Sequence, residues 1–163
     1  MSLSSYSPFV DKEKAGIFFS PVFTSWGWAT WKNKWEGYQP QALIIRTTPN
    51  SENKKYYKYT INLPPFFTND ALRYIADLGI QHLIVDLPSI DRKSDNGILG
   101  NHRIFWGDGE NAKGDVNPDS INTITELAYI QDEVIDGFYF LNIQLPHFQC
   151  DAAPSRPILM KII

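Results

Sequence analysis

The chain has 163 residues, of which 43% are hydrophobic and 14% aromatic, and this fits one domain with its own core. A formal charge of −3 and a pI near 5.5 provide no basic surface for phosphate backbones, so nucleic acid is not an expected partner. A single cysteine, Cys150, excludes an internal disulfide, and no apolar stretch reaches the roughly 18 residues of a membrane span. We expect one cytoplasmic domain over residues 1–163, with no membrane partner and no standard export signal.

The first predicted element is a helix in a tryptophan-rich segment, Phe23 to Tyr38. Trp28, Trp31 and Trp35 follow the i, i+3, i+7 spacing of one helical face. Such a face can pack in the core, contact a second subunit or another partner, or offer a stacking platform for sugar rings or bases. Burial is the favoured interpretation, because aromatic stripes at helical spacing usually belong to a core.

The next elements alternate between strand and helix. The apolar run 42–46 stops at a polar turn, which predicts a buried strand. Thr68 is the predicted N-cap of a helix that ends near Leu78, with Gly79 just past its end. Gln81–Asp86 then predicts a second buried strand that finishes in a carboxylate. Further strands are predicted at 121–129, 138–145 and 156–163, so the fold class is α/β, with a mixed β-sheet and few helices.

A cluster of polar residues follows the second buried strand. It contains Asp86, Ser89 and Asp91, and His102 comes later in a segment interpreted as a loop. Sheets in α/β proteins tend to bind ligands at such strand ends, because loops converge there. A purely structural interpretation stays open, in which Asp86 caps a turn, Asp91 is solvated and His102 is an ordinary surface or core histidine.

Glu126 interrupts an otherwise apolar, strand-like stretch. Burying an unpaired carboxylate is costly, so an inward-facing Glu126 would need a cation, a proton or a hydrogen-bond partner. An outward-facing Glu126 would simply be solvated. The alternation of a strand cannot decide between these two orientations without its neighbouring strands.

Four ordered motifs lie along residues 41–163: His82–Asp91, His102, Thr123–Leu127 and Asp151–Pro157. Together they resemble the later half of the cyclase family of metal-dependent hydrolases, which includes kynurenine formamidase. The resemblance implies a swivelling β/β/α domain with two divalent metals, typically zinc. These metals would activate water to open an amide, formamide or cyclic amide bond in a small-molecule substrate.

The resemblance also implies roles for individual residues. His102 and Glu126 would be metal ligands, with zinc as the expected metal and manganese as the alternative. Asp86, Ser89 and Asp91 would surround these ligands as catalytic residues. Asp151 and Arg156 would pair with each other or shape the floor of a binding pocket.

The chain departs from the family pattern in its earlier part. The family's His-x-x-x-His-x-Asp signature holds the first metal, and the three histidines here, His82, His102 and His147, do not have that spacing. Catalytic zinc normally has three protein ligands plus water, and two ligands hold it weakly. Two functions therefore stand side by side: a homo-oligomeric metal-dependent hydrolase, and a non-catalytic relative that oligomerises or binds a partner through the tryptophan-rich segment.

Overall fold

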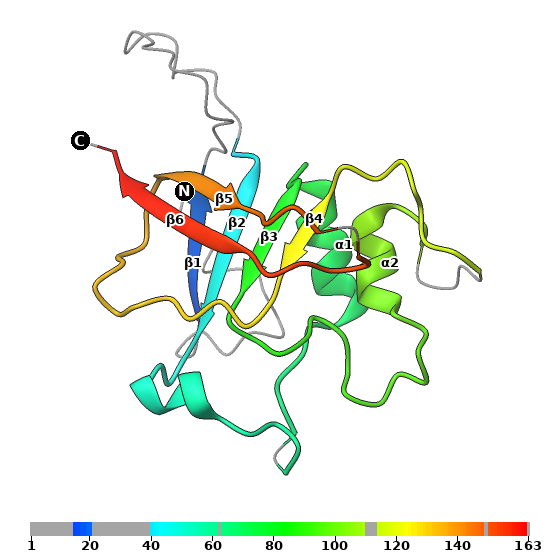
Figure 1. Cartoon of the computed structure of the whole chain (residues 1–163), viewed down its shortest axis with the longest axis horizontal. Coiled ribbons are helices and arrows are strands. Elements are labelled where there is room, and N and C mark those ends of the chain that lie inside the picture. Colours follow the sequence, from blue (N-terminus) through cyan, green and yellow to red (C-terminus); the bar gives the residue numbers. More distant parts are fainter. Residues whose placement is uncertain (1–14, 21–39, 62, 110–113, 149, 163) are drawn as a thin grey trace, which may run out of the picture.

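A computed structural model describes residues 15–20, 40–61, 63–109, 114–148 and 150–162 (Figure 1). The tryptophan-rich segment and its predicted helix lie outside the described residues. No helix in the described ranges is long and apolar enough to cross a membrane. The elements in chain order are β1 (Ala15–Ser20), β2 (Ala42–Thr47), the 3-10 helix η3 (Glu52–Tyr56), α1 (Asn69–Asp77), β3 (His82–Val85), α2 (Gly100–Trp106), β4 (Thr123–Thr125), β5 (Tyr139–Gln144) and β6 (Arg156–Lys161).

The strands form two sheets. The larger sheet has the order β1-β2-β3-β4, in which β1 is antiparallel to β2 while β2, β3 and β4 are parallel. Strands β5 and β6 form a separate antiparallel pair. The two α-helices cover one face of the larger sheet, and the β5–β6 pair crosses the other (Figure 1). The predicted mixed α/β architecture is therefore confirmed.

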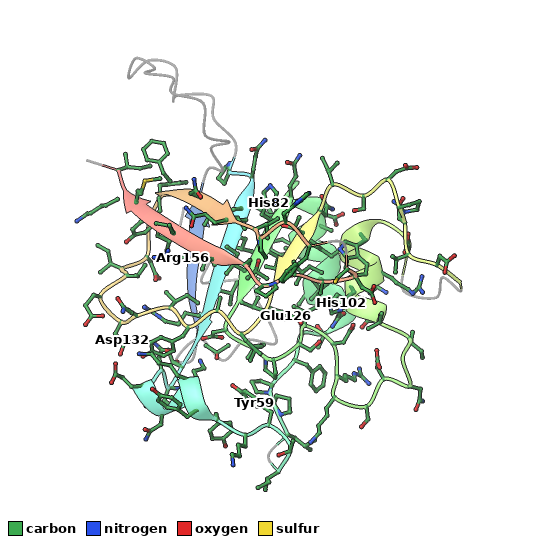
Figure 2. The ribbon with its side chains drawn as sticks, in the orientation of Figure 1. Tyr59, His82, His102, Glu126, Asp132 and Arg156 are labelled. Atoms are coloured by element: carbon green, nitrogen blue, oxygen red, sulfur yellow. The ribbon has the colours of Figure 1, made fainter. Side chains whose placement is uncertain are left out.

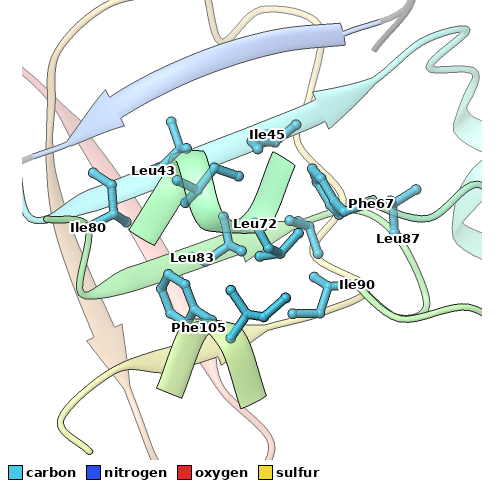
Figure 3. Close-up of a cluster of buried hydrophobic side chains, with 12 residues drawn as sticks. Leu43, Ile45, Phe67, Leu72, Ile80, Leu83, Leu87, Ile90 and Phe105 are labelled. Carbon is cyan, nitrogen blue, oxygen red and sulfur yellow. The ribbon is translucent and has the colours of Figure 1, made fainter. Parts of the chain in front are cut away.

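The apolar runs of β2 and β3 are continuous because both faces of these strands are buried. Successive side chains of a strand point to opposite faces, so each strand contributes to two clusters. The cluster on the helix side includes Leu43, Ile45, Leu83, Val85, Leu72, Ile75 and Phe105 (Figure 3). On the other side Ala42, Ile44 and Ile84 pack against Tyr139 and Leu141 of β5. Each fully buried Leu, Ile or Phe contributes on the order of 1.5–3 kcal/mol.

Helix α1 matches its predicted signals. The Oγ1 of Thr68 accepts a hydrogen bond from the backbone N–H of Ala71, at 3.3 Å. Leu72 and Ile75 face the core, and Gly79 follows the helix at φ +74°, a conformation that costs glycine little. The parallel pairing of β2 with β3 on either side of α1 also agrees with the predicted order of elements.

Two local predictions are corrected. The strand predicted at 121–129 is only Thr123–Thr125, because the left-handed backbone of Leu127, at φ +56°, interrupts the regular pairing with the β3 segment. The segment around His102 is the helix α2 and not a loop. Its N-cap residue, Leu99, makes no side-chain capping hydrogen bond and has a left-handed backbone. The usual start signal of a helix is therefore missing from the local sequence.

Candidate functional site

A histidine lies between two carboxylates next to the ends of β3 and β4. The Nδ1 of His102 is 2.6 Å from Oδ2 of Asp91, and its Nε2 is 3.5 Å from Oε1 of Glu126. We call Asp91, His102 and Glu126 the histidine–carboxylate site. His102 comes from α2, Asp91 from the loop after β3, and Glu126 from the residue that follows β4. His102 and Glu126 lie close together in Figure 2.

Asp91 holds the first turn of α2 in place. Its Oδ1 accepts a hydrogen bond from the backbone N–H of Asn101, at 2.7 Å, and this N–H has no partner within the helix. Asp91 is only 6% exposed, so the expectation of a solvated carboxylate is wrong. The backbone N–H of Asp91 donates to the Ser89 hydroxyl at 3.2 Å. The side chain that contacts His102 therefore also caps the helix that carries His102.

Asn101 fixes the same loop from the other side. Its buried side-chain amide donates to the backbone carbonyls of Phe67 and Ile90, both at 2.7 Å. These bonds connect α2 to the segment before α1 and to the loop after β3. Hydrogen bonds among three separate parts of the chain thus fix the position of Asp91 relative to His102.

Glu126 is positioned by the chain around it. Its Oε1 accepts a hydrogen bond from the backbone N–H of Ile90, at 2.8 Å. Immediately after it, the N–H of Leu127 donates to the carbonyl of Leu87 at 2.8 Å. The Glu126 side chain is 26% exposed and faces His102, so neither a fully buried nor a freely solvated carboxylate describes it.

The contact with Asp91 sets the orientation of the imidazole. In the tautomer that donates its Nδ1 proton to the Asp91 carboxylate, the Nε2 lone pair is directed to the side of Glu126. Trp106 lies one helical turn further along α2, with its ring centroid 5.1 Å from that of His102. The His102 side chain is only 14% exposed, which limits its freedom to turn.

The donor atoms of His102 and Glu126 fit a divalent cation. Two ligand atoms at about 2.0–2.1 Å from a tetrahedral zinc ion lie about 3.3 Å apart. The 3.5 Å separation of Nε2 and Oε1 is close to that value. A carboxylate on the second ring nitrogen is the usual support of a zinc-binding histidine, and Asp91 has that position. Among the described residues, no group of three or more His, Cys, Asp or Glu side chains is placed to hold a metal ion together.

Asp86 lies apart from these groups. Its side chain is 1% exposed and accepts hydrogen bonds from the Thr47 N–H at 2.8 Å and the Thr47 hydroxyl at 3.0 Å. The ammonium group of Lys54 forms an ion pair with Asp86 at 2.6 Å. Asp86 therefore joins the end of β2 to η3, and within the described ranges it forms no hydrogen bond or ion pair with His102 or Glu126.

The other sequence candidates are spread over the molecule. Asp151 and Arg156 are exposed and form no ion pair with each other among the described side chains. His147 is exposed as well. The Nδ1 of His82 lies 2.8 Å from the Thr123 hydroxyl, and partial burial lowers the pKa of this histidine. His82 thus links β3 to β4 and does not belong to the histidine–carboxylate site.

Lys54 and Trp106 were not predicted from the sequence as neighbours of the candidate residues. One local signal was present for α2: Gly107 follows it at φ +87°, as expected just past the end of a helix. Comparison with family models, with curated proteins and with solved structures gave no match. The function is therefore inferred from this chain's own residues.

Proposed function

We propose that the chain is a metal-dependent hydrolase of the cyclase type, which opens an amide, formamide or cyclic amide bond in a small molecule. The observation that carries the proposal is the geometry of His102. Its Nε2 is 3.5 Å from a Glu126 oxygen, while its Nδ1 is fixed by the buried Asp91 carboxylate. The sequence motifs that resemble the cyclase family contain the same three residues.

Within this proposal each residue of the site has one task. His102 and Glu126 hold the divalent metal, with zinc expected from a nitrogen and an oxygen donor. A divalent metal bound there would supply Lewis-acid activation of water, the chemistry that opening an amide bond needs. Asp91 keeps the His102 ring in the orientation and tautomer that present Nε2. The Ser89 hydroxyl accepts a hydrogen bond from the Asp91 N–H and stabilises the loop.

The proposal includes the source of the missing ligands. Because His102 and Glu126 are two ligands and catalytic zinc normally has three, further donors must come from outside this pair. A second copy of the chain is one such source, and homo-oligomerisation is part of the proposal. The proposal also includes a cyclase-like arrangement of the domain and a cytoplasmic location.

The test is calorimetric titration of zinc into the chelator-treated chain and two variants, His102→Gln and Glu126→Gln. We expect each variant to bind zinc at least about tenfold more weakly than the parent chain. The matched control is His147→Gln, because His147 is exposed and lies outside the site. Equal zinc binding by His102→Gln and the parent would contradict the proposed metal ligands.

Activity is measured separately on the zinc- or manganese-loaded chain with a panel of N-formyl aryl amides and cyclic amides. The proposal expects turnover that is lost in His102→Gln and kept in His147→Gln. Tight zinc binding without any turnover would remove the hydrolase assignment and leave a metal-binding protein.

A further inference from the structure

A second site is formed by a cavity of about 620 Å³ between the end of β2, the segment from η3 to Phe67, and the start of α1. Its base is buried and apolar and includes Ile45, Phe67 and Leu87, which lie toward one side of the core cluster (Figure 3). The rim includes Leu63 and Phe66, which are 82% and 43% exposed. Asp91, His102 and Glu126 do not line it.

The wall of the cavity is tied to the rest of the molecule. The Lys93 ammonium donates to the backbone carbonyls of Tyr59 and Thr60, both at 2.9 Å. The Phe67 N–H donates to the carbonyl of Ile90 at 3.2 Å, and the Arg92 guanidinium lies over the Phe66 ring. A wall held at several points keeps the cavity open without a ligand, as small-molecule sites usually are.

The charge of the cavity wall is compensated internally. Lys54 is the one charged residue among the described residues that line it. Its three ammonium protons are used by Asp86 Oδ2 at 2.6 Å, the Thr47 carbonyl at 2.7 Å and the Thr47 hydroxyl at 2.6 Å. A charged ligand would lose its hydration here without gaining a counter-ion. The wall therefore selects against ions of either sign.

Four aromatic side chains line the cavity: Tyr57, Tyr59, Phe66 and Phe67. The rings of Tyr57 and Tyr59 meet edge to face with centroids 5.1 Å apart, and Phe66 and Phe67 lie further along the same segment. Ring edges and faces arranged in this way favour another flat ring. The Tyr59 hydroxyl is an uncharged hydrogen-bond donor, and burial, followed by the nearby charge of Asp86, raises its pKa further above the ordinary value.

We propose that this cavity binds an uncharged, largely apolar small molecule that contains an aromatic ring. Its volume lies within the range of about 300–1,000 Å³ that is typical of small-molecule sites. A bound ring would contact the buried base and cover the exposed apolar rim. This binding needs no metal and is independent of the proposed hydrolysis.

The test uses three naphthalene probes of the same shape: neutral 2-naphthalenemethanol, anionic 2-naphthoate and cationic 2-naphthylmethylammonium. Each is titrated calorimetrically into the full chain in the presence of a metal chelator. We expect one molecule of the neutral probe per cavity, bound at least about tenfold more tightly than either ion. No binding of the neutral probe, or equal binding of all three, would overturn the proposal.

Variants locate the binding. Phe66→Ala and Leu63→Ala remove exposed rim side chains, so the fold is expected to survive, and circular dichroism checks this. Phe138→Ala and Ile121→Ala are the matched controls, because these side chains are 62% and 69% exposed and do not line the cavity. We expect about fivefold weaker binding in the rim variants alone. The same loss in the controls would show non-specific adsorption and reject the site.

Discussion

Asp86 and Asp91 come from the same short segment after β3, and both are buried, at 4% and 6% exposure. Asp86 is neutralised by Lys54 and receives two further hydrogen bonds from Thr47. Asp91 instead receives the N–H of Asn101 and faces the ring of His102. The first carboxylate is consumed by a structural ion pair. The second carboxylate is shared between the N-terminus of α2 and the ring of His102, whose Nε2 faces Glu126.

The contrast shows that burial of a carboxylate does not by itself indicate function. A lysine partner neutralises the charge of the carboxylate, so little electrostatic attraction remains for a ligand. A histidine partner is instead oriented by the carboxylate, which makes the other ring nitrogen a better metal ligand. The arrangement of partners therefore separates a residue that stabilises the fold from one that positions a candidate metal ligand.

The largest expected effect comes from breaking the structural pair. Lys54→Met leaves the Asp86 charge buried without its cation, and we expect the free energy of unfolding to fall by about 3 kcal/mol. The loss stays at the low end for a buried pair because Thr47 still donates two hydrogen bonds to Asp86. Urea unfolding at pH 7 measures it.

The control for that change is Lys55→Met at the neighbouring position. The Lys55 ammonium pairs with the exposed Glu52 carboxylate, and an exposed pair of this kind adds little to stability. Identical unfolding curves for the two variants would mean that the Lys54–Asp86 pair does not stabilise the fold.

A smaller effect, on zinc affinity, is expected from Asp91→Asn. An amide nitrogen facing Nδ1 of His102 favours the tautomer with its proton on Nε2, which then cannot bind a metal. On the proposed function, we expect zinc binding to weaken by about 10- to 100-fold in calorimetric titration.

Asp95→Asn is the matched control for this second change. Asp95 lies in the same loop and accepts hydrogen bonds from the N–H groups of Gly97 and Leu99, but it does not contact His102. If both variants lose zinc affinity equally, the loss of negative charge is the cause, and Asp91 has no special positioning role.

The smallest expected effect is a change in alkaline stability at Tyr59, whose pKa is raised above 10 by burial and then by Asp86. The folded chain holds this proton more strongly than the unfolded chain does. The resulting stabilisation is complete below pH 10 and is lost as the pH rises through the folded pKa. Tyr59→Phe should therefore lose less stability above pH 10 than the parent chain.

Unfolding by urea between pH 8 and pH 11 compares Tyr59→Phe with Tyr56→Phe, since Tyr56 is exposed. An Asp86→Asn background sharpens the comparison, because it removes the charge that adds to the Tyr59 effect. Matching alkaline curves for Tyr59→Phe and Tyr56→Phe would show that burial of Tyr59 has no consequence for stability.

Local patterns were sufficient for the elements with complete signals. Thr68 and Gly79 mark the ends of α1, and the apolar runs of β2 and β3 predict strands that are buried on both faces. The mixed α/β class follows from the order of these elements. His102, Glu126 and Asp91 were also identified as candidates from residue type and motif order.

Contacts distant in sequence decided the rest. The start of α2 depends on Asp91, which accepts a hydrogen bond from the N–H of Asn101 ten positions later. The N-cap residue Leu99 has no capping side chain that would predict this start from the sequence. Glu126 accepts a hydrogen bond from the N–H of Ile90, 36 residues away in the sequence, and Lys54 pairs with Asp86, 32 residues away. The sequence by itself determined the helix and strands whose hydrogen bonds and apolar faces are encoded locally. Only the tertiary structure decided which buried carboxylate faces His102, because that choice rests on pairings between separate segments.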